Sequence, residues 1–357
     1  MSIAAPGAFR AELIVESYLS GVRIDSFLIR HFRNYTSFRM QRMIRAGHAA
    51  IDGVRVGLAS RVFRGQRVTM CLTEPPDKLL ESQPLPLDIL YEDPWLIVIN
   101  KRAGMASHPV GDYQSDTLSN ALQHHFDRQT ALPGLLRAGI VHRLDRLTSG
   151  VIVVAKEHLA HRRLSIGFQR GRVAKRYVAV VDGLLSPAKG VIDRPIGAAP
   201  GSVLMSAEPT ARDAKPAITR YEVLRRFDSH SLVRATPLTG RNHQIRVHLA
   251  SIGHPVVGDV FYGPFGRFRR LPRAARENVE MALDEICAPD TTSTPLIARH
   301  ALHAERIALE HPITREPLDF RAPLPPDMVQ LLRQLSHPAV SDFHVVASCV
   351  GAGEKGV

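Results

Sequence analysis

Apolar residues are grouped in short runs along the chain from Leu87 onward. Three continuous runs rich in β-branched residues predict buried strands, at residues 96–99, 150–155 and 177–181. Two longer segments, 159–168 and 243–252, carry apolar residues at helical spacing and predict helices. Because these strands and helices do not alternate in a strict βαβ order, the pattern predicts an α+β fold with a mixed, largely antiparallel central sheet.

The first part of the chain has a different pattern, which predicts a small α/β unit over residues 12–73. Asp25 and Ser37 each precede apolar residues at helical spacing, so we expect each to cap a helix. The second helix should end at Gly47, since glycine commonly follows the last helical turn. Asp52 and Gly53 then separate two short strands, and an Asp-Gly pair in that position predicts a hairpin turn.

Shifts in composition divide the rest of the chain. Residues 74–86 are rich in proline and mixed in charge, which predicts a linker. Residues 87–336 then form a larger domain. Residues 337–357 show no clear pattern, as is typical of a flexible tail.

The chain is strongly basic. It has 46 Lys and Arg against 34 Asp and Glu, which gives a net charge of +12 and a pI of about 10.1. A protein this basic usually meets a polyanion, and nucleic acid is the commonest. An anionic membrane surface is the competing partner, but no basic amphipathic helix favours it.

Much of this charge lies in the N-terminal unit, where residues 21–67 hold ten Arg and only two Asp. Arg39, Arg42 and Arg45 recur every three residues, so we expect them to lie near one another along one helix. A charge run is often only a solvated face, but an imbalance this large favours a surface that contacts phosphates. Residues 263–295, with five Arg, fit an RNA-facing loop and an ordinary insertion equally well.

The three cysteines lie far apart in the sequence, at Cys71, Cys287 and Cys349. This spacing argues against a zinc site and a disulfide framework, so we expect a reduced, cytoplasmic protein without a metal. The N-terminus lacks a charged start followed by an apolar stretch, and no stretch approaches the ~20 apolar residues that span a bilayer. We therefore expect neither secretion nor a membrane partner.

The strongest candidate for chemistry is the segment HRLDRLTSG at residues 142–150. Asp145 stands there between Arg143 and Arg146, just ahead of the predicted strand. A carboxylate in such a place stays ionised and loses hydration, which suits a nucleophile or a general base. An ordinary structural ion pair explains this segment alone equally well, so the choice depends on the rest of the chain.

Six motifs in order along the chain resemble those of the RluA/RluD-type pseudouridine synthase family. They are NKxxGMxxHP at 100–109, GIVHRLDxxTSG at 139–150, KRY at 175–177, LTGRxHQIRxH at 238–248, GHPxxGD at 253–259 and RHALHA at 299–304. Each motif is weak alone, but together and in this order they are highly specific. The N-terminal unit is similar to the small RNA-binding domain named after ribosomal protein S-four, through GxRIDxF at 21–27, the Asp-Gly turn and Gly65.

The resemblance implies an isomerase that detaches a uracil of RNA from its ribose nitrogen, turns it, and rejoins it through carbon, with no cofactor. The target base must first leave the stack. Asp145 would attack or deprotonate the sugar, and Arg246 would pair with Asp145 and hold it ionised. Tyr177 would offer an aromatic face and a phenol to the uracil. On the residues alone, core packing is the favoured role of Tyr177, and Arg246 could serve only a phosphate.

Other residues near these motifs are candidates for RNA binding. Four of them are expected to orient neighbouring groups or to contact the RNA: His142, Arg143, Arg241 and His243. Two departures from the family pattern bear on the choice of target, because Arg102 replaces the usual Pro and Leu147 replaces the usual Asp.

The expected substrate is a structured RNA, most often 23S ribosomal RNA for a chain with an S-four-like domain, and tRNA is the alternative. A monomer is expected, because Arg-rich surfaces repel each other. Two other functions stay open: a non-catalytic RNA-binding or ribosome-assembly factor, and a hydrolase that uses Asp145 on a small molecule. The factor would need no intact Asp145, and the hydrolase would leave the ten N-terminal Arg unexplained.

Overall fold

The computed structural model of the chain describes residues 9–76, 80–110, 114–130, 133–202, 204–269 and 296–336. An N-terminal unit has its own four-stranded antiparallel sheet, with strand order β1-β4-β2-β3. Its elements are β1 (Phe9–Ile14), η1 (Ser17–Leu19), α1 (Ile24–His31), α2 (Ser37–Arg45), β2 (Ala49–Ile51), β3 (Val54–Arg55) and β4 (Arg67–Leu72). A separate cluster of buried apolar side chains from these elements forms its core.

The predicted turn and helix end of this unit are present, but both predicted helix caps are wrong. Asp52 and Gly53 join β2 to β3 with positive φ values of 48° and 84°, as a tight hairpin turn requires. The residue that caps α2 is Thr36, whose hydroxyl accepts a hydrogen bond from a backbone N–H one turn on. Asp25 lies inside the first turn of α1, where it is buried and bound to Arg23.

The rest of the chain is organised around a ten-stranded sheet, whose main path is β10-β14-β15-β9-β16-β8-β6-β5. β17 pairs with β16 and β7 pairs with β8 beside this path. The pairing of β16 with β8 is parallel and the other pairings are antiparallel, so the predicted α+β fold with a mixed, largely antiparallel sheet is confirmed. The strands are β5 (Ile89–Glu92), β6 (Leu96–Lys101), β7 (Gly139–Ile140), β8 (Ser149–Ala155), β9 (Ala174–Asp182), β10 (Lys189–Asp193), β14 (Ile218–Arg226), β15 (His230–Pro237), β16 (Leu302–Glu310) and β17 (Pro317–Arg321).

Helices cover both faces of this sheet, which explains why β6 and β8 are continuous apolar runs. Alternate residues of β8, such as Val151 and Val153, pack with α4 (His158–Gln169) on one face. Ile152 and Val154 point the other way and pack with α3 (Leu118–Asp127). The end of the loop that leads into β8 is therefore fixed by buried structure.

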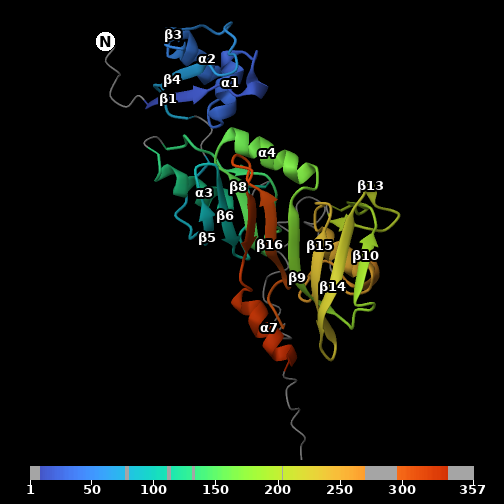
Figure 1. Cartoon of the computed structure of the whole chain (residues 1–357). Coiled ribbons are helices and arrows are strands. Elements are labelled where there is room, and N and C mark those ends of the chain that lie inside the picture. The colour runs from blue at the N-terminus through green and yellow to red at the C-terminus, as the bar shows by residue number, and fades with distance from the viewer. Residues whose placement is uncertain are drawn as a thin grey trace, which may run out of the picture.

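The other half of the sheet carries α5 (Gln244–Ser251) and α7 (Pro326–Ser336), which share a core with β9, β14 and β15. A three-stranded antiparallel sheet lies beside α5, with order β12-β11-β13. Its strands are β11 (Ile196–Ala198), β12 (Met205–Ser206) and β13 (Arg212–Lys215), and the short η2 (Pro264–Gly266) follows α5. Figure 1 shows α7 at the end of the molecule opposite the N-terminal unit.

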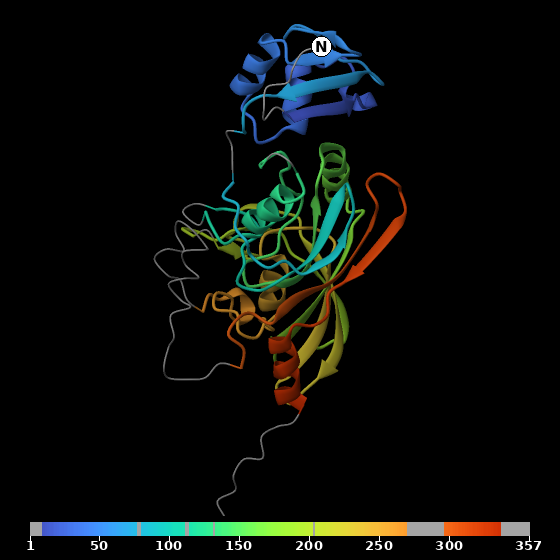
Figure 2. The same ribbon diagram turned by 90° about the vertical axis from the view of Figure 1, so that its left-hand side faces the viewer.

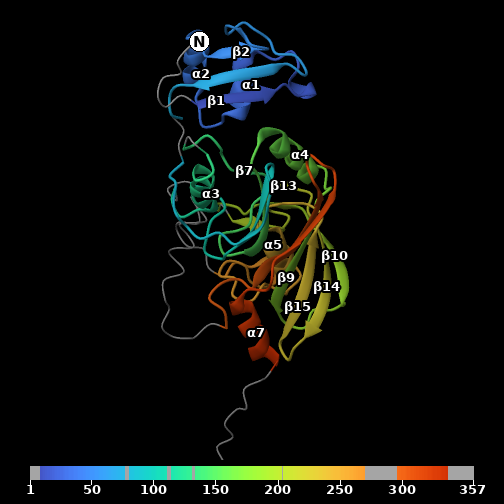
Figure 3. The same cartoon turned by 60° about the vertical axis from the view of Figure 1, so that its left-hand side comes forward.

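The N-terminal unit stands over α3 and α4 in all three views (Figures 1, 2 and 3). The guanidinium of Arg162 in α4 lies 3.9 Å from the ring centroid of Tyr18. The side-chain amide of Asn34, which is buried, donates to the carbonyl of Gly134 at 2.7 Å. The segment predicted as a linker also contacts both units, since Glu74 bonds to α2 and Leu85 packs near α3.

Parts of two predicted segments, residues 270–295 and 337–357, lie outside the described residues. Among the residues that are described, no helix is both long and apolar enough to cross a membrane. Cys71, the cysteine that falls within the described ranges, is unpaired.

Candidate active site

Asp145 lies on a loop that buried contacts hold in place from several sides. The next residue back, Leu144, is buried, and its backbone carbonyl accepts a hydrogen bond from the Ser107 hydroxyl at 2.9 Å. The backbone N–H of Thr148 donates to the Asp145 carbonyl at 2.9 Å. The ammonium of Lys101, which is only 1% exposed, donates to the Arg146 carbonyl at 3.2 Å. The motifs at 100–109 and 139–150 thus contact each other, and these contacts fix the loop.

Arg246, buried in α5, connects two carboxylates. Its Nη1 donates to Oδ2 of Asp145 at 2.9 Å. Its Nε and Nη2 donate to the two oxygens of Asp259, at 2.6 and 3.0 Å. Asp259 is itself fully buried and accepts backbone N–H bonds from Phe261 and Tyr262. The predicted pairing of Asp145 with Arg246 is present, and Asp259 fixes that guanidinium from behind.

This surrounding charge keeps Asp145 ionised. Burial raises the pKa of the Asp145 carboxyl, but the neighbouring His243 ring and the Arg246 guanidinium more than offset it, so the pKa lies well below its usual range. Burial also lowers the pKa of His243 to about 4, although Asp145 opposes this shift. His243 is therefore neutral near pH 7, and Arg246 is the cation that persists beside Asp145.

His243 adopts an unusual backbone conformation at the start of α5. Its φ is 53°, in the left-handed region that residues other than glycine rarely occupy. This turn brings its Nε2 to 3.9 Å from Oδ2 of Asp145 and its Nδ1 to 2.6 Å from the Tyr262 hydroxyl. The helix start thus presents one histidine to Asp145 at the edge of the loop.

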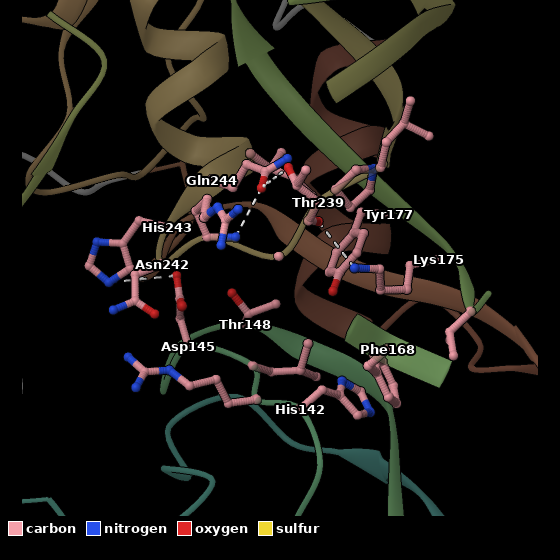
Figure 4. A pocket seen from close by; sticks show the side chains of 18 of the residues that line it. His142, Asp145, Thr148, Phe168, Lys175, Tyr177, Thr239, Asn242, His243 and Gln244 are labelled. Atoms are coloured by element: carbon pink, nitrogen blue, oxygen red, sulfur yellow. Dashed lines mark hydrogen bonds and ion pairs between the residues drawn. The ribbon is translucent and has the colours of Figure 1, made fainter. Parts of the chain in front are cut away.

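A cavity of about 510 Å³ opens in front of Asp145, within the size range of small-molecule sites. Tyr177, from β9, lines it together with Phe168 from the end of α4 (Figure 4). Burial and the nearby Asp145 raise the pKa of the Tyr177 phenol, which stays protonated at neutral pH. Lys175, two residues earlier, donates to the Thr239 carbonyl at 3.2 Å. The cavity combines an ionised carboxylate, a neutral phenol and aromatic surface.

The structure brings together seven of the predicted site residues around this cavity: Asp145, Tyr177, Arg246, His142, Arg143, Arg241 and His243. His142 stacks on Phe168, with ring centroids 4.5 Å apart, and accepts the Val153 N–H at 2.9 Å. Arg241 donates to the Pro216 carbonyl at 3.0 Å. Arg143 is exposed at the rim.

Arg39, Arg42 and Arg45 lie on α2 in the N-terminal unit and do not line the cavity. Arg39 and Arg42 form ion pairs with Glu74, the first residue of the predicted linker. Their charge is partly neutralised there, so the helix is less strongly cationic than the sequence predicts. Arg45 is exposed.

The sequence alone does not indicate the roles of Asp259 and His300. His300 bonds to the Thr148 hydroxyl at 2.8 Å, and burial lowers its pKa to about 3. The available signal was the motif at 253–259, which ends in a carboxylate that needs a partner if buried. Among the described residues, no group of three or more His, Cys, Asp or Glu side chains is arranged to hold a metal.

Comparisons with known proteins point to one family. Residues 95–251 match the family model described as RNA pseudouridylate synthase. The chain is 38% identical over 322 residues to ribosomal large subunit pseudouridine synthase D of Vibrio cholerae. This match covers 89% of this chain and 93% of that protein. It is 35% identical over 313 residues to the uncharacterized RNA pseudouridine synthase YlyB of Bacillus subtilis, covering 88% and 94%. The structure of human RNA pseudouridylate synthase domain containing 4 aligns with a TM-score of 0.52 at 29% identity, over 70% of this chain and 93% of that one.

Proposed function

The chain belongs to the RNA pseudouridine synthase family and is an RNA pseudouridine synthase, and we propose that it modifies specific uridines of large-subunit (23S) ribosomal RNA in the cytoplasm. The rRNA substrate is supported by the names of relatives that match along nearly their whole length. The observation that carries the chemistry is the ionised Asp145, paired with Arg246 at a nucleoside-sized cavity.

In this proposal Asp145 acts on the sugar of a uridine that has left its stack. The carboxylate attacks or deprotonates the sugar as the bond to the uracil nitrogen breaks. Arg246 holds the carboxylate ionised and aimed throughout, because it is itself fixed by Asp259. The freed uracil turns against the Tyr177 ring, which excludes water from one side. The base then bonds to the sugar through carbon, as the ester to Asp145 breaks or the Asp145 carboxyl returns its proton to the sugar. The uracil carbon that forms this bond loses its proton and the freed ring nitrogen takes one up, so the product is an isomer of the substrate.

Residues 12–73 serve as an S-four-like RNA-binding domain in this proposal, and residues 87–336 as the catalytic domain of a monomer. Seven of the ten Arg in residues 21–67 lie outside α2, so the unit keeps a strong positive charge although Arg39 and Arg42 pair with Glu74. Phosphate contacts by these Arg would position the RNA without reading its sequence. Arg143 and Arg241 at the cavity rim would contact the strand around the target nucleotide, beside His142 and His243.

The test is the Asp145→Asn variant together with maps of pseudouridine in total RNA, made with and without this gene. The substitution keeps shape and removes charge, so we expect no pseudouridine formation while RNA affinity stays within about threefold of wild type. A site lost from 23S RNA on deletion, and not restored by Asp145→Asn, supports the proposal. Normal turnover of this variant, or loss of sites in tRNA alone, contradicts the corresponding part of it.

A further inference from the structure

A second cavity, of about 340 Å³, lies between α4 and the turn that joins β16 to β17. Its wall carries four guanidinium groups and one carboxylate: Arg163, Arg170, Arg172, Arg315 and Glu310. The charge of these side chains sums to +3, four positive and one negative. The mechanism proposed above uses none of them.

This basic cavity adjoins the active-site cavity across the turn from α4 to β9. Gln169 and Gly171 line the active-site cavity, whereas Arg170 and Arg172 line the basic one. Val173 lines both. An RNA strand that leaves the active-site cavity over this turn therefore meets the arginines of the basic cavity next.

Two of the arginines bond to other residues of the protein, and three of the four, Arg170, Arg172 and Arg315, are exposed. Nη1 of Arg163 donates to the Pro312 carbonyl at 2.7 Å, which ties α4 to the β16–β17 turn. Nη1 of Arg315 donates to Glu310 at 2.6 Å. Arg170 and Arg172 are exposed at the mouth. Each guanidinium has five N–H donors, and planar guanidinium groups suit the oxygens of a phosphate.

Gly167 in α4 adds a second observation. Glycine inside a helix costs about 1 kcal/mol relative to alanine. A Cβ built on Gly167 would lie 3.7 Å from Val173, an ordinary contact, so packing does not require glycine there. Because Gly167 lines the basic cavity, its missing side chain leaves that space open to a ligand.

We propose that the basic cavity binds a backbone phosphate of the RNA substrate next to the target nucleotide. The proposal rests on the proposed function for the identity of the RNA. A phosphate bound there would fix the strand on one side of the flipped nucleotide, while Asp145 and Tyr177 act on the nucleotide itself. Arginine pairs with phosphate bidentately, which supplies both affinity and orientation.

The test compares two doubly substituted proteins that lose the same charge. Arg170→Gln/Arg172→Gln removes the two arginines of the basic cavity that lie on the turn from α4 to β9. Arg128→Gln/Arg225→Gln removes two exposed arginines that line neither cavity. Binding of a large-subunit rRNA transcript to the two variants is measured at several salt concentrations. We expect the cavity variant to bind about tenfold more weakly than the control variant, with a dependence of log affinity on log salt concentration that is smaller in magnitude by about 2.

Equal affinities and equal salt slopes in the two variants would overturn the proposal. A further arm adds inorganic phosphate and follows thermal unfolding. A second contrary outcome is that phosphate stabilises the wild type but not the cavity variant, while the salt dependence of RNA affinity is the same for these two proteins. The cavity then binds a free anion and not the RNA, and the proposal also fails. Turnover of the wild-type protein tests the proposed function separately, because the slopes are measured on binding whether or not a uridine is modified.

Discussion

Arg246 is held between two carboxylates, and this arrangement decides how Asp145 is presented to a substrate. A lone Arg-Asp pair could rotate with the loop of Asp145. Here Asp259 accepts hydrogen bonds from two of the three guanidinium nitrogens, and backbone N–H groups hold Asp259 in turn. Asp145 is therefore positioned by α5 and the segment after it, in addition to the contacts of its own loop.

Substituting Asp259→Asn should test this positioning role. Breaking a buried ion pair costs about 3–5 kcal/mol of stability, so we expect a lower midpoint of urea unfolding. Turnover should fall about a hundredfold well below that midpoint, because a misplaced catalytic group costs this much, while RNA affinity stays unchanged. The control is Asp327→Asn, which breaks a two-bond pair with Arg299 that lines no part of the cavity. Equal losses of turnover in the two variants would contradict the role of Asp259.

The ionisation of the site leads to a prediction about pH. The pKa of Asp145 lies far below neutral, and burial puts the pKa values of His243 and His300 at about 4 and about 3. Lowering the pH from 8 to 5 therefore changes the charge of none of them, and the single-turnover rate should stay level over this range. RNA binding by Asp145→Asn over the same range is the control for changes in the RNA. A fall of the single-turnover rate with a midpoint near pH 6 would show that one of the histidines titrates between pH 8 and 5.

At the scale of elements, the junction of β8 with β16 holds the catalytic loop at its end. Gly150 in β8 has a φ of 115°, and a Cβ there would lie 2.2 Å from the Ala304 carbonyl oxygen. Close approach of the two backbones thus requires glycine just after the loop of Asp145.

We therefore expect Gly150→Ala to destabilise the protein by about 2 kcal/mol or more, through both strain and overpacking. The change is measured as the free energy of unfolding in urea. Gly167→Ala in α4 is the matched control, because its Cβ meets only Val173 at 3.7 Å and alanine favours the helix. Its free energy of unfolding should stay the same or rise by up to about 1 kcal/mol. A stable Gly150→Ala protein would mean that the two strands can move apart at little cost.

The elements that follow local patterns could be predicted from the sequence, and those set by distant contacts could not. The apolar runs of β6 and β8 and the periodicity of α4 are visible locally. The parallel pairing of β16 with β8 joins segments about 150 residues apart, through His303 and Ser149, and no local pattern encodes it. The cap of α2 was misplaced by one residue because Thr36 and Ser37 are both good capping residues.

The same division applies to the site. Asp145 and its pairing with Arg246 could be predicted because both stand in motifs that resemble those of a known family. Asp259 was missed because its importance comes from total burial against Arg246, and burial depends on how α5 packs. The pairing of Arg39 and Arg42 with Glu74 was missed for a related reason, since the chain must fold back along α2 to make it.

At the scale of the whole molecule, the N-terminal unit contacts the catalytic half at α4 and at the backbone of Gly134. Tyr18 stacks under Arg162 of α4, while Arg33 lies 3.3 Å from His158 at the start of the same helix. Burial lowers the pKa of His158 to about 4, so it adds no positive charge beside these arginines at neutral pH. The stacking of Tyr18 with Arg162 is one of the attractive contacts across this surface, beside the hydrogen bond of Asn34 to Gly134.

Replacing Tyr18 should show whether this contact serves RNA binding. A guanidinium over an aromatic ring contributes about 0.5–2 kcal/mol, and its loss lets the N-terminal unit move relative to α4. For RNA that is bound to one unit, contact with the other unit then adds less binding free energy. Tyr18→Ala should therefore weaken RNA binding about fivefold without changing the single-turnover rate at saturating RNA. Tyr18→Phe is the control, because it keeps the ring and removes only a buried hydroxyl that has no hydrogen-bond partner. If Tyr18→Ala binds RNA as tightly as Tyr18→Phe, the two units need no fixed arrangement to hold the substrate.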